Sequence, residues 1–178
     1  EDLNLQTYLR DSAVDISALS AWDVTTGKAG AVVAVVDTGY RPHAAMAGRI
    51  LPGYDFVSDL VIANDGDGRD ADASDPGDWI ARSDLTDSRT FDGCDIAISS
   101  WHGTSIAGII AANTNDGVWT AGIDWSVKIL PVRVLGKCYG NDSDILDGLA
   151  WAAGLDVPGV PANPTPAQVI NVSLGEQG

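Results

Sequence analysis

The sequence of 178 residues lacks long hydrophobic runs and is poor in basic residues. Its longest apolar runs, such as 31–36, are far shorter than the ~20 residues of a helix that crosses a bilayer. Ten Lys and Arg residues stand against 25 acidic residues, so the formal net charge is −15. A field of this sign repels phosphate backbones and anionic membrane surfaces. We therefore expect a soluble protein whose partners include neither nucleic acid nor a membrane.

Glutamate is scarce as well, because 23 of the 25 acidic residues are Asp. Helical surfaces favour Glu over Asp, so these residues are expected in loops, caps or metal sites. Twelve of them lie within 55–95 beside only three Arg, which gives this range a net charge of −9. The range repels itself unless something neutralises it. The 45% of hydrophobic residues nevertheless suffices for the core of one domain.

Only two cysteines are present, and both lie in sequence rich in Gly and Asp. This setting favours a disulfide between Cys94 and Cys138 over two buried thiols, and closing that loop would gain about 4 kcal/mol from chain entropy. A disulfide indicates an oxidising compartment, so we expect a secreted, extracellular protein. The opening EDLNLQTYLR has neither the basic nor the apolar region of a targeting signal. We expect that any such signal has been removed or was never present.

Three apolar runs without alternation are typical of strands buried on both faces of a parallel sheet: 31–37, 127–135 and 169–174. Helices are predicted between them at 102–112 and at 144–154, the second behind a Ser143 or Asp142 cap. This order predicts an α/β fold, a mostly parallel sheet flanked by helices. The ranges 58–95 and 157–166 are irregular by composition. Because the sequence stops directly after the third strand, we expect an incomplete fold and a larger domain.

Two residues in this framework are suited to catalysis. Asp37 ends the first strand, at the edge of an α/β sheet where ligands gather, although an Asp that starts a turn reads the same way. His102 opens the helix 102–112, where a surface or capping role is the alternative. Together a strand-end Asp and a helix-start His can orient and perform general-base chemistry on a hydroxyl nucleophile.

Three local sequences, in the same order along the chain, resemble the subtilisin-like (subtilase) serine peptidases. AVVAVVDTG resembles the motif of the family's catalytic Asp, HGTSIAG that of its catalytic His, and VINVSLG the strand that lines its substrate cleft. The resemblance covers about 22–175. It implies a serine endopeptidase that hydrolyses peptide bonds in proteins through an Asp-His-Ser triad, with Asp37 and His102 as catalytic residues.

The resemblance also implies how a peptide substrate binds. It would add as a strand between two segments of the chain. Side chains of an apolar pocket are expected beside that strand, with plain core as the alternative role for the larger ones. The implied substrate-binding residues are Leu135, Gly140, Ile145, Ser173, Leu174 and Gly175.

The family's nucleophile lies in a GTS-x-A motif on a later helix, after an oxyanion-hole Asn, and neither segment occurs in this sequence. GTSIA does occur at 103–107, but Ser105 follows His102 on one helix and is poorly oriented for attack. We therefore expect the chain alone, as the N-terminal portion (1–178) of one catalytic domain, to be inactive. Its expected partners are the C-terminal remainder with the Ser and Asn, a protein or peptide substrate, and a propeptide or inhibitor.

The range 64–78, NDGDGRDADASDPGD, places oxygen donors at nearly every second position. Ca²⁺ takes six to eight such donors, so we predict a calcium site there, with a solvated acidic loop as the alternative. Some secreted bacterial subtilases carry a long Asp-rich insertion, and the resemblance implies that 58–95 is one. The candidate ligands are Asp65, Asp67, Asp70, Asp72 and Asp75, with a backbone carbonyl near Arg69.

Two other classes of function fit parts of the sequence. A secreted calcium-binding module without catalysis would explain the Asp-rich range and the missing serine. A phosphotransfer or sugar-kinase-like domain would explain a strand that ends in Asp-x-Gly. The latter lacks a Gly-rich phosphate loop with Lys, since the three lysines lie elsewhere. The peptidase hypothesis accounts for the most features.

Overall fold

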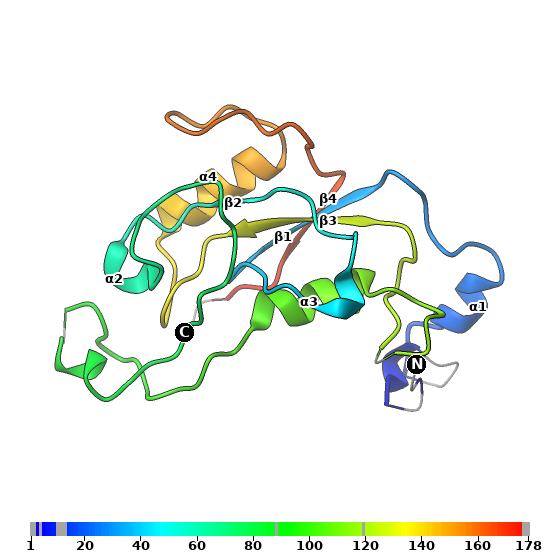
Figure 1. Ribbon diagram of the computed structural model, residues 1–178, viewed down its shortest axis with the longest axis horizontal. Coiled ribbons are helices and arrows are strands. Elements are labelled where there is room, and N and C mark those ends of the chain that lie inside the picture. Colours follow the sequence, from blue (N-terminus) through cyan, green and yellow to red (C-terminus); the bar gives the residue numbers. More distant parts are fainter. Residues whose placement is uncertain (1–2, 4, 10–13, 88, 119, 176–178) are drawn as a thin grey trace.

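The computed structural model describes residues 3, 5–9, 14–87, 89–118 and 120–175. Four strands form one sheet in the order β2-β3-β1-β4, and every neighbouring pair is parallel (Figure 1). The strands are Val32–Asp37 (β1), Tyr54–Asp55 (β2), Lys128–Arg133 (β3) and Val169–Val172 (β4). The predicted α/β class is confirmed.

The helices connect these strands and cover the sheet. They are Ala18–Trp22 (α1), Leu60–Ala63 (α2), His102–Ala111 (α3) and Asp142–Ala152 (α4), with 3-10 turns at Thr7–Leu9, Ala44–Met46 and Asp84–Thr86. The predicted cap of α4 was wrong, because Asn141 keeps an extended backbone and the helix begins at the next residue. No helix in the described part of the chain is long and apolar enough to span a membrane.

Alternate residues of β1 pack on opposite faces of the sheet, as the pleat of a strand requires. Ala34 and Val36 lie in the core beneath α4, where they share a cluster with Trp151. Val35 lies in the core beneath α3, together with Ala107. The two helices therefore cover opposite faces, with α4 above the strands and α3 below them in Figure 1. This burial on both faces is what the unbroken β-branched run predicts.

The strand β4 is an edge strand, and its apolar run is less buried than those of β1 and β3. It pairs with β1 on one side and has no described partner on the other, and Val169 remains 57% exposed. A run of apolar residues predicts burial, but an edge strand buries its side chains only where a helix reaches it. Ile170 is half-buried against the α4 core, whereas Val172 is exposed.

The register places three charged side chains in a row at the carboxyl edge of the sheet. Asp37 of β1 is aligned with Arg133 of β3, and Arg133 with Asp55 of β2. Val36 is aligned with Val172, so the chain that follows β4 leaves the sheet beside Asp37. Strand β2 was not predicted, since only two of its residues pair. The register thereby brings distant segments to one edge, where ligands bind in open α/β sheets.

Candidate active site

Asp37 and His102 meet at the carboxyl edge of the sheet. Asp37 ends β1 and is fully buried, while His102 is the first residue of α3 and its side chain is 43% exposed. His102 Nδ1 lies 2.8 Å from Asp37 Oδ2 and 2.9 Å from Oδ1. The structure thus brings together the two residues that the sequence singles out for catalysis.

Backbone geometry that few residues tolerate sets this contact. Trp101 has a left-handed backbone (φ 50°), which turns the chain into α3 at His102. A Cβ added at Gly103 would lie 2.2 Å from the carbonyl oxygen of Gly39 and 3.2 Å from Asp37. Only glycine permits the helix to approach the strand end this closely, which explains the small residue after His102.

The hydrogen bonds around Asp37 fix the proton of His102. The buried carboxylate needs donors, and Oδ1 accepts from the backbone N–H of Thr38 at 2.7 Å. His102 Nδ1 faces both carboxylate oxygens, so Nδ1 carries the proton and Nε2 is left as a base. A buried carboxylate in this position also stabilises the imidazolium ion. The pair can therefore act as an oriented general base.

A cleft of about 960 Å³ opens at His102, and it contains all six residues predicted to bind substrate. Gly140 lies on one side, in the loop between β3 and α4, and the segment after β4 lies on the other. Leu135, Ile145 and Leu174 line the cleft and are also half-buried against the α4 core. These three side chains therefore line the cleft and pack against the core at the same time. The cleft-lining residues are Leu135, Gly140, Ile145, Ser173, Leu174 and Gly175.

The predicted disulfide forms between Cys94 and Cys138, with a Cα–Cα separation of 6.1 Å. It joins the end of the Asp-rich range 58–95 to the β3–α4 loop, and both cysteines line the cleft. Lys137 supports the same junction, because its ammonium group lies 2.7 Å from Asp84. The Asp-rich range therefore forms one wall of the cleft.

Ser105 makes a local contact that matches its expected lack of a nucleophilic role. Its Oγ lies 3.1 Å from the carbonyl oxygen of Trp101, one turn earlier, to which it donates. A hydroxyl bonded to its own helix in this way serves the first turn of α3.

Two carboxylates from the Asp-rich range support the start of α3, a role that the sequence did not reveal. Asp75 is buried and accepts from Thr38 Oγ1 at 2.8 Å, and Thr38 Oγ1 accepts from Gly103 N–H at 3.1 Å. Burial raises the pKa of the Asp75 carboxyl. Asp78 accepts two bonds of 2.6 Å from Ser100, whose Oγ accepts from the backbone N–H of the site histidine.

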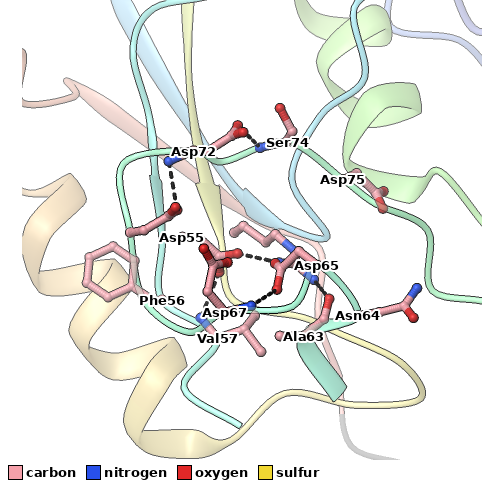
Figure 2. A network of polar contacts seen from close by, with 12 residues as sticks. Asp55, Phe56, Val57, Ala63, Asn64, Asp65, Asp67, Asp72, Ser74 and Asp75 are labelled. Atoms are coloured by element: carbon pink, nitrogen blue, oxygen red, sulfur yellow. Dashed lines mark hydrogen bonds and ion pairs between the residues drawn. The ribbon is translucent and has the colours of Figure 1, made fainter. Parts of the chain in front are cut away.

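The six residues predicted to bind calcium do not converge on one point. Figure 2 shows Asp65 and Asp67 beside Asp55, whereas Asp72 and Asp75 lie apart from them along the segment. Within the described ranges, no group of three or more His, Cys, Asp or Glu side chains is placed to hold a metal ion. The arrangement therefore does not fit the predicted calcium site.

Several of these residues accept hydrogen bonds from backbone amides or form ion pairs with arginine. Asp70 accepts from Asp72 N–H, and Asp72 from Ser74 N–H, as is common for Asp in turns. Arg69 is engaged through its guanidinium group, which lies 2.5 Å from Asp144 and 2.6 Å from Asp147. These contacts account for oxygen donors at alternate positions without an ion.

Arg133 is a buried cation that pairs with Asp65 of the Asp-rich range and with Asp55, just before that range. Its side chain is 1% exposed, and its guanidinium group bonds to Asp55, to Asp65 and to the carbonyl oxygen of Ala63. Burial raises the pKa of Asp55 to about 7, even though Arg133 lowers it. The self-repulsion expected from the sequence is thus relieved by a cation on β3.

Comparisons with known sequences and structures identify the family of this chain. The sequence profile of the subtilase family (peptidase S8) matches residues 28–178. The chain belongs to the subtilase family. Many subtilases bind calcium, although the carboxylates of this subtilase do not form the predicted site.

Similar proteins are extracellular proteases. The chain is 52% identical to an extracellular protease of Xanthomonas campestris over 89% of its length, and 48% identical to an extracellular basic protease of Dichelobacter nodosus over 92%. It spans 26% and 27% of the length of these two relatives. A solved protease structure from Pseudoalteromonas arctica is 51% identical, with a TM-score of 0.90 over 98% of this chain and 50% of that one.

Proposed function

We propose that this subtilase chain is the N-terminal portion of the catalytic domain of a secreted serine endopeptidase, to which it contributes two of the three triad residues. The observation that carries the proposal is the contact of 2.8 Å between His102 Nδ1 and the buried Asp37, at the mouth of a cleft. The extracellular proteases among its relatives and the disulfide support the secreted location.

In the proposed mechanism, Asp37 holds His102 in the tautomer that leaves Nε2 free. Nε2 removes the proton from a serine hydroxyl while that oxygen attacks the carbonyl carbon of the scissile peptide bond. The imidazolium that forms is stabilised by Asp37, and it returns the proton to the leaving amine. The serine and the oxyanion-hole Asn are supplied by the C-terminal remainder of the same peptidase, so the chain alone is inactive.

The substrate in this proposal is a protein or peptide in extended conformation. The segment 173–175 leaves the edge strand β4 and lines the cleft, where its backbone would pair with a peptide strand, and Gly140 lines the same cleft. Leu135, Ile145 and Leu174 provide an apolar surface for a substrate side chain. A propeptide or inhibitor would occupy the same strand position.

Calcium has no part in the proposed reaction, since the predicted ligands are engaged by backbone amides and arginines. The alternative of a calcium-binding module without catalysis rested on the Asp-rich range and on the missing serine. No observation on the described residues favours it over the peptidase, whereas the contact between Asp37 and His102 remains unexplained by such a module.

Labelling of the full-length protein by a fluorophosphonate, which reacts only with an activated serine, tests the proposal. We expect His102→Ala to abolish labelling and Asp37→Asn to slow it by about 10⁴-fold, as the loss of the orienting carboxylate does in other triads. The matched control is His43→Ala, which removes the other histidine of this sequence and should leave labelling unchanged. Full labelling of His102→Ala would refute the proposal. The 178-residue chain on its own should take up no label.

A further inference from the structure

We infer that Asp75 is a positioning residue, which holds the Asp37–His102 pair in register through the hydroxyl group of Thr38. The carboxylate comes from the Asp-rich range, 37 residues away in sequence, and is 6% exposed. This inference builds on the roles proposed above for Asp37 and His102. Its test does not require peptidase activity.

The hydroxyl of Thr38 joins the two chain segments that carry the pair. Its oxygen accepts from the N–H of Gly103 at 3.1 Å, and its proton is donated to Asp75 Oδ2 at 2.8 Å. Gly103 N–H belongs to the first turn of α3 and has no acceptor within the helix. Thr38 follows Asp37 and Gly103 follows His102, so this one hydroxyl ties the neighbours of both residues together.

The Asp75 carboxylate is itself fixed in place by further bonds. Its Oδ1 accepts from Gly77 N–H at 2.8 Å, and its backbone N–H donates to the carbonyl oxygen of Tyr40 at 2.8 Å. Tyr40 N–H in turn donates to the carbonyl oxygen of Ala73 at 3.1 Å. The segment around Asp75 therefore runs alongside the turn that follows Asp37, and each holds the other.

Tight packing makes the pair sensitive to this bridge. The α carbon of Gly103 lies against the carbonyl oxygen of Gly39, so the start of α3 cannot move closer to the strand end. Without the bridge it can only move away, which lengthens the contact between Asp37 and His102. A longer contact weakens the hydrogen bond between His102 Nδ1 and the carboxylate of Asp37.

The chemical shift of the Nδ1 proton of His102 is therefore the readout, measured by NMR on the 178-residue chain, because this proton lies in the contact with Asp37. The sequence holds only His43 and His102, so His43 serves as an internal reference. We expect Thr38→Val, which removes the hydroxyl without changing charge, to move this signal upfield, because the hydrogen bond to Asp37 becomes longer and weaker. Thr38→Ser, which keeps the hydroxyl, should restore the wild-type value.

Two charge-neutralising variants separate the bridge from simple electrostatics. Asp75→Asn should move the NMR signal of the His102 Nδ1 proton in the same direction as Thr38→Val. Asp72→Asn removes a charge from the same segment, at an exposed turn, and should leave that signal unchanged. A folded Thr38→Val chain with the wild-type signal would overturn the inference, as would equal shifts in the two Asn variants. If Thr38→Val does not fold, Asp75→Asn against Asp72→Asn decides the question.

In the full-length peptidase, the same variants should lower kcat with little change in KM. This second readout fails if the proposed function is wrong, but the NMR shift does not. A shift of the NMR signal without fluorophosphonate labelling would retain the positioning role and reject the peptidase. Labelling without the NMR shift would retain the peptidase and reject the positioning role.

Discussion

The buried Arg133 offers the sharpest test of how the Asp-rich range is held. Its guanidinium group bonds to Asp55 and Asp65, and to the carbonyl oxygen of Ala63. Arg133→Met preserves most of the apolar length of the side chain and removes the charge and the donors. The two carboxylates and the carbonyl then lose their partner in the interior. Removing one partner of a buried ion pair costs about 3–5 kcal/mol of stability.

This cost depends on pH because burial raises the pKa of Asp55 to about 7, while the unperturbed value is 3.8. Between these values the folded state holds a proton that the unfolded chain has released, so stability falls as the pH rises from about 4 to about 7. Arg133 lowers the pKa of Asp55, and its removal raises that pKa further. At pH 5 Asp55 is neutral in both proteins, whereas at pH 8 only the wild-type protein offers it a cation.

We therefore expect Arg133→Met to lose about 3–5 kcal/mol at pH 8 and clearly less at pH 5, measured by urea unfolding. Arg82→Met, at an exposed position of the same range, is the matched control and should lie within about 0.5 kcal/mol of the wild type at both pH values. A loss below about 1 kcal/mol at pH 8, or the same loss at both values, would refute the reasoning. Adding Asp55→Asn to Arg133→Met should recover part of the loss and flatten its pH dependence.

The remaining predictions concern the disulfide, the helix start and calcium. Replacing Cys94 and Cys138 by Ser should cost up to about 4 kcal/mol in the free energy of unfolding, since a 44-residue loop is released, and an unchanged urea midpoint would contradict this. Gly103→Ala should cost about 1–3 kcal/mol and move the NMR signal of the His102 Nδ1 proton upfield, because its Cβ would meet the carbonyl oxygen of Gly39. Adding Ca²⁺ to chelator-treated 178-residue chain should raise the unfolding temperature by less than about 2 °C, and a rise well above this would show that the Asp-rich range binds the ion despite its arginine partners.

Local patterns were sufficient for the elements that carry Asp37 and His102. The β-branched run before Asp37 predicts a strand buried on both faces, and the small residues after His102 predict a helix that approaches it closely. Both predictions depend on residues adjacent in sequence, so they hold without knowledge of the fold. That the two side chains meet follows from the rule that sites form at the carboxyl edge of a parallel sheet.

The prediction of calcium ligands depended on local spacing alone. Alternating Asp residues indicate oxygen donors, and the same spacing suits a metal loop or a series of turns capped by Asp side chains. Which of these forms depends on the cation that reaches the segment. Here it is Arg133, 68 residues from Asp65 and 78 from Asp55 in sequence. Nothing local to the Asp-rich range identifies that partner, and an arginine after the four apolar residues 129–132 of β3 was an unused signal.

The Asp-rich range is fastened to the carboxyl edge of the sheet at two neighbouring points. Asp65 binds Arg133 at the end of β3, and Asp75 binds Thr38 just after the end of β1. Because β1 and β3 are adjacent and in register there, the two attachments hold the range across the strand ends beside His102. Asp65 and Asp75, which the sequence predicts as metal ligands, make these other contacts in the structure. One carboxylate balances a buried cation, and the other accepts the hydrogen bond that aligns the candidate general base.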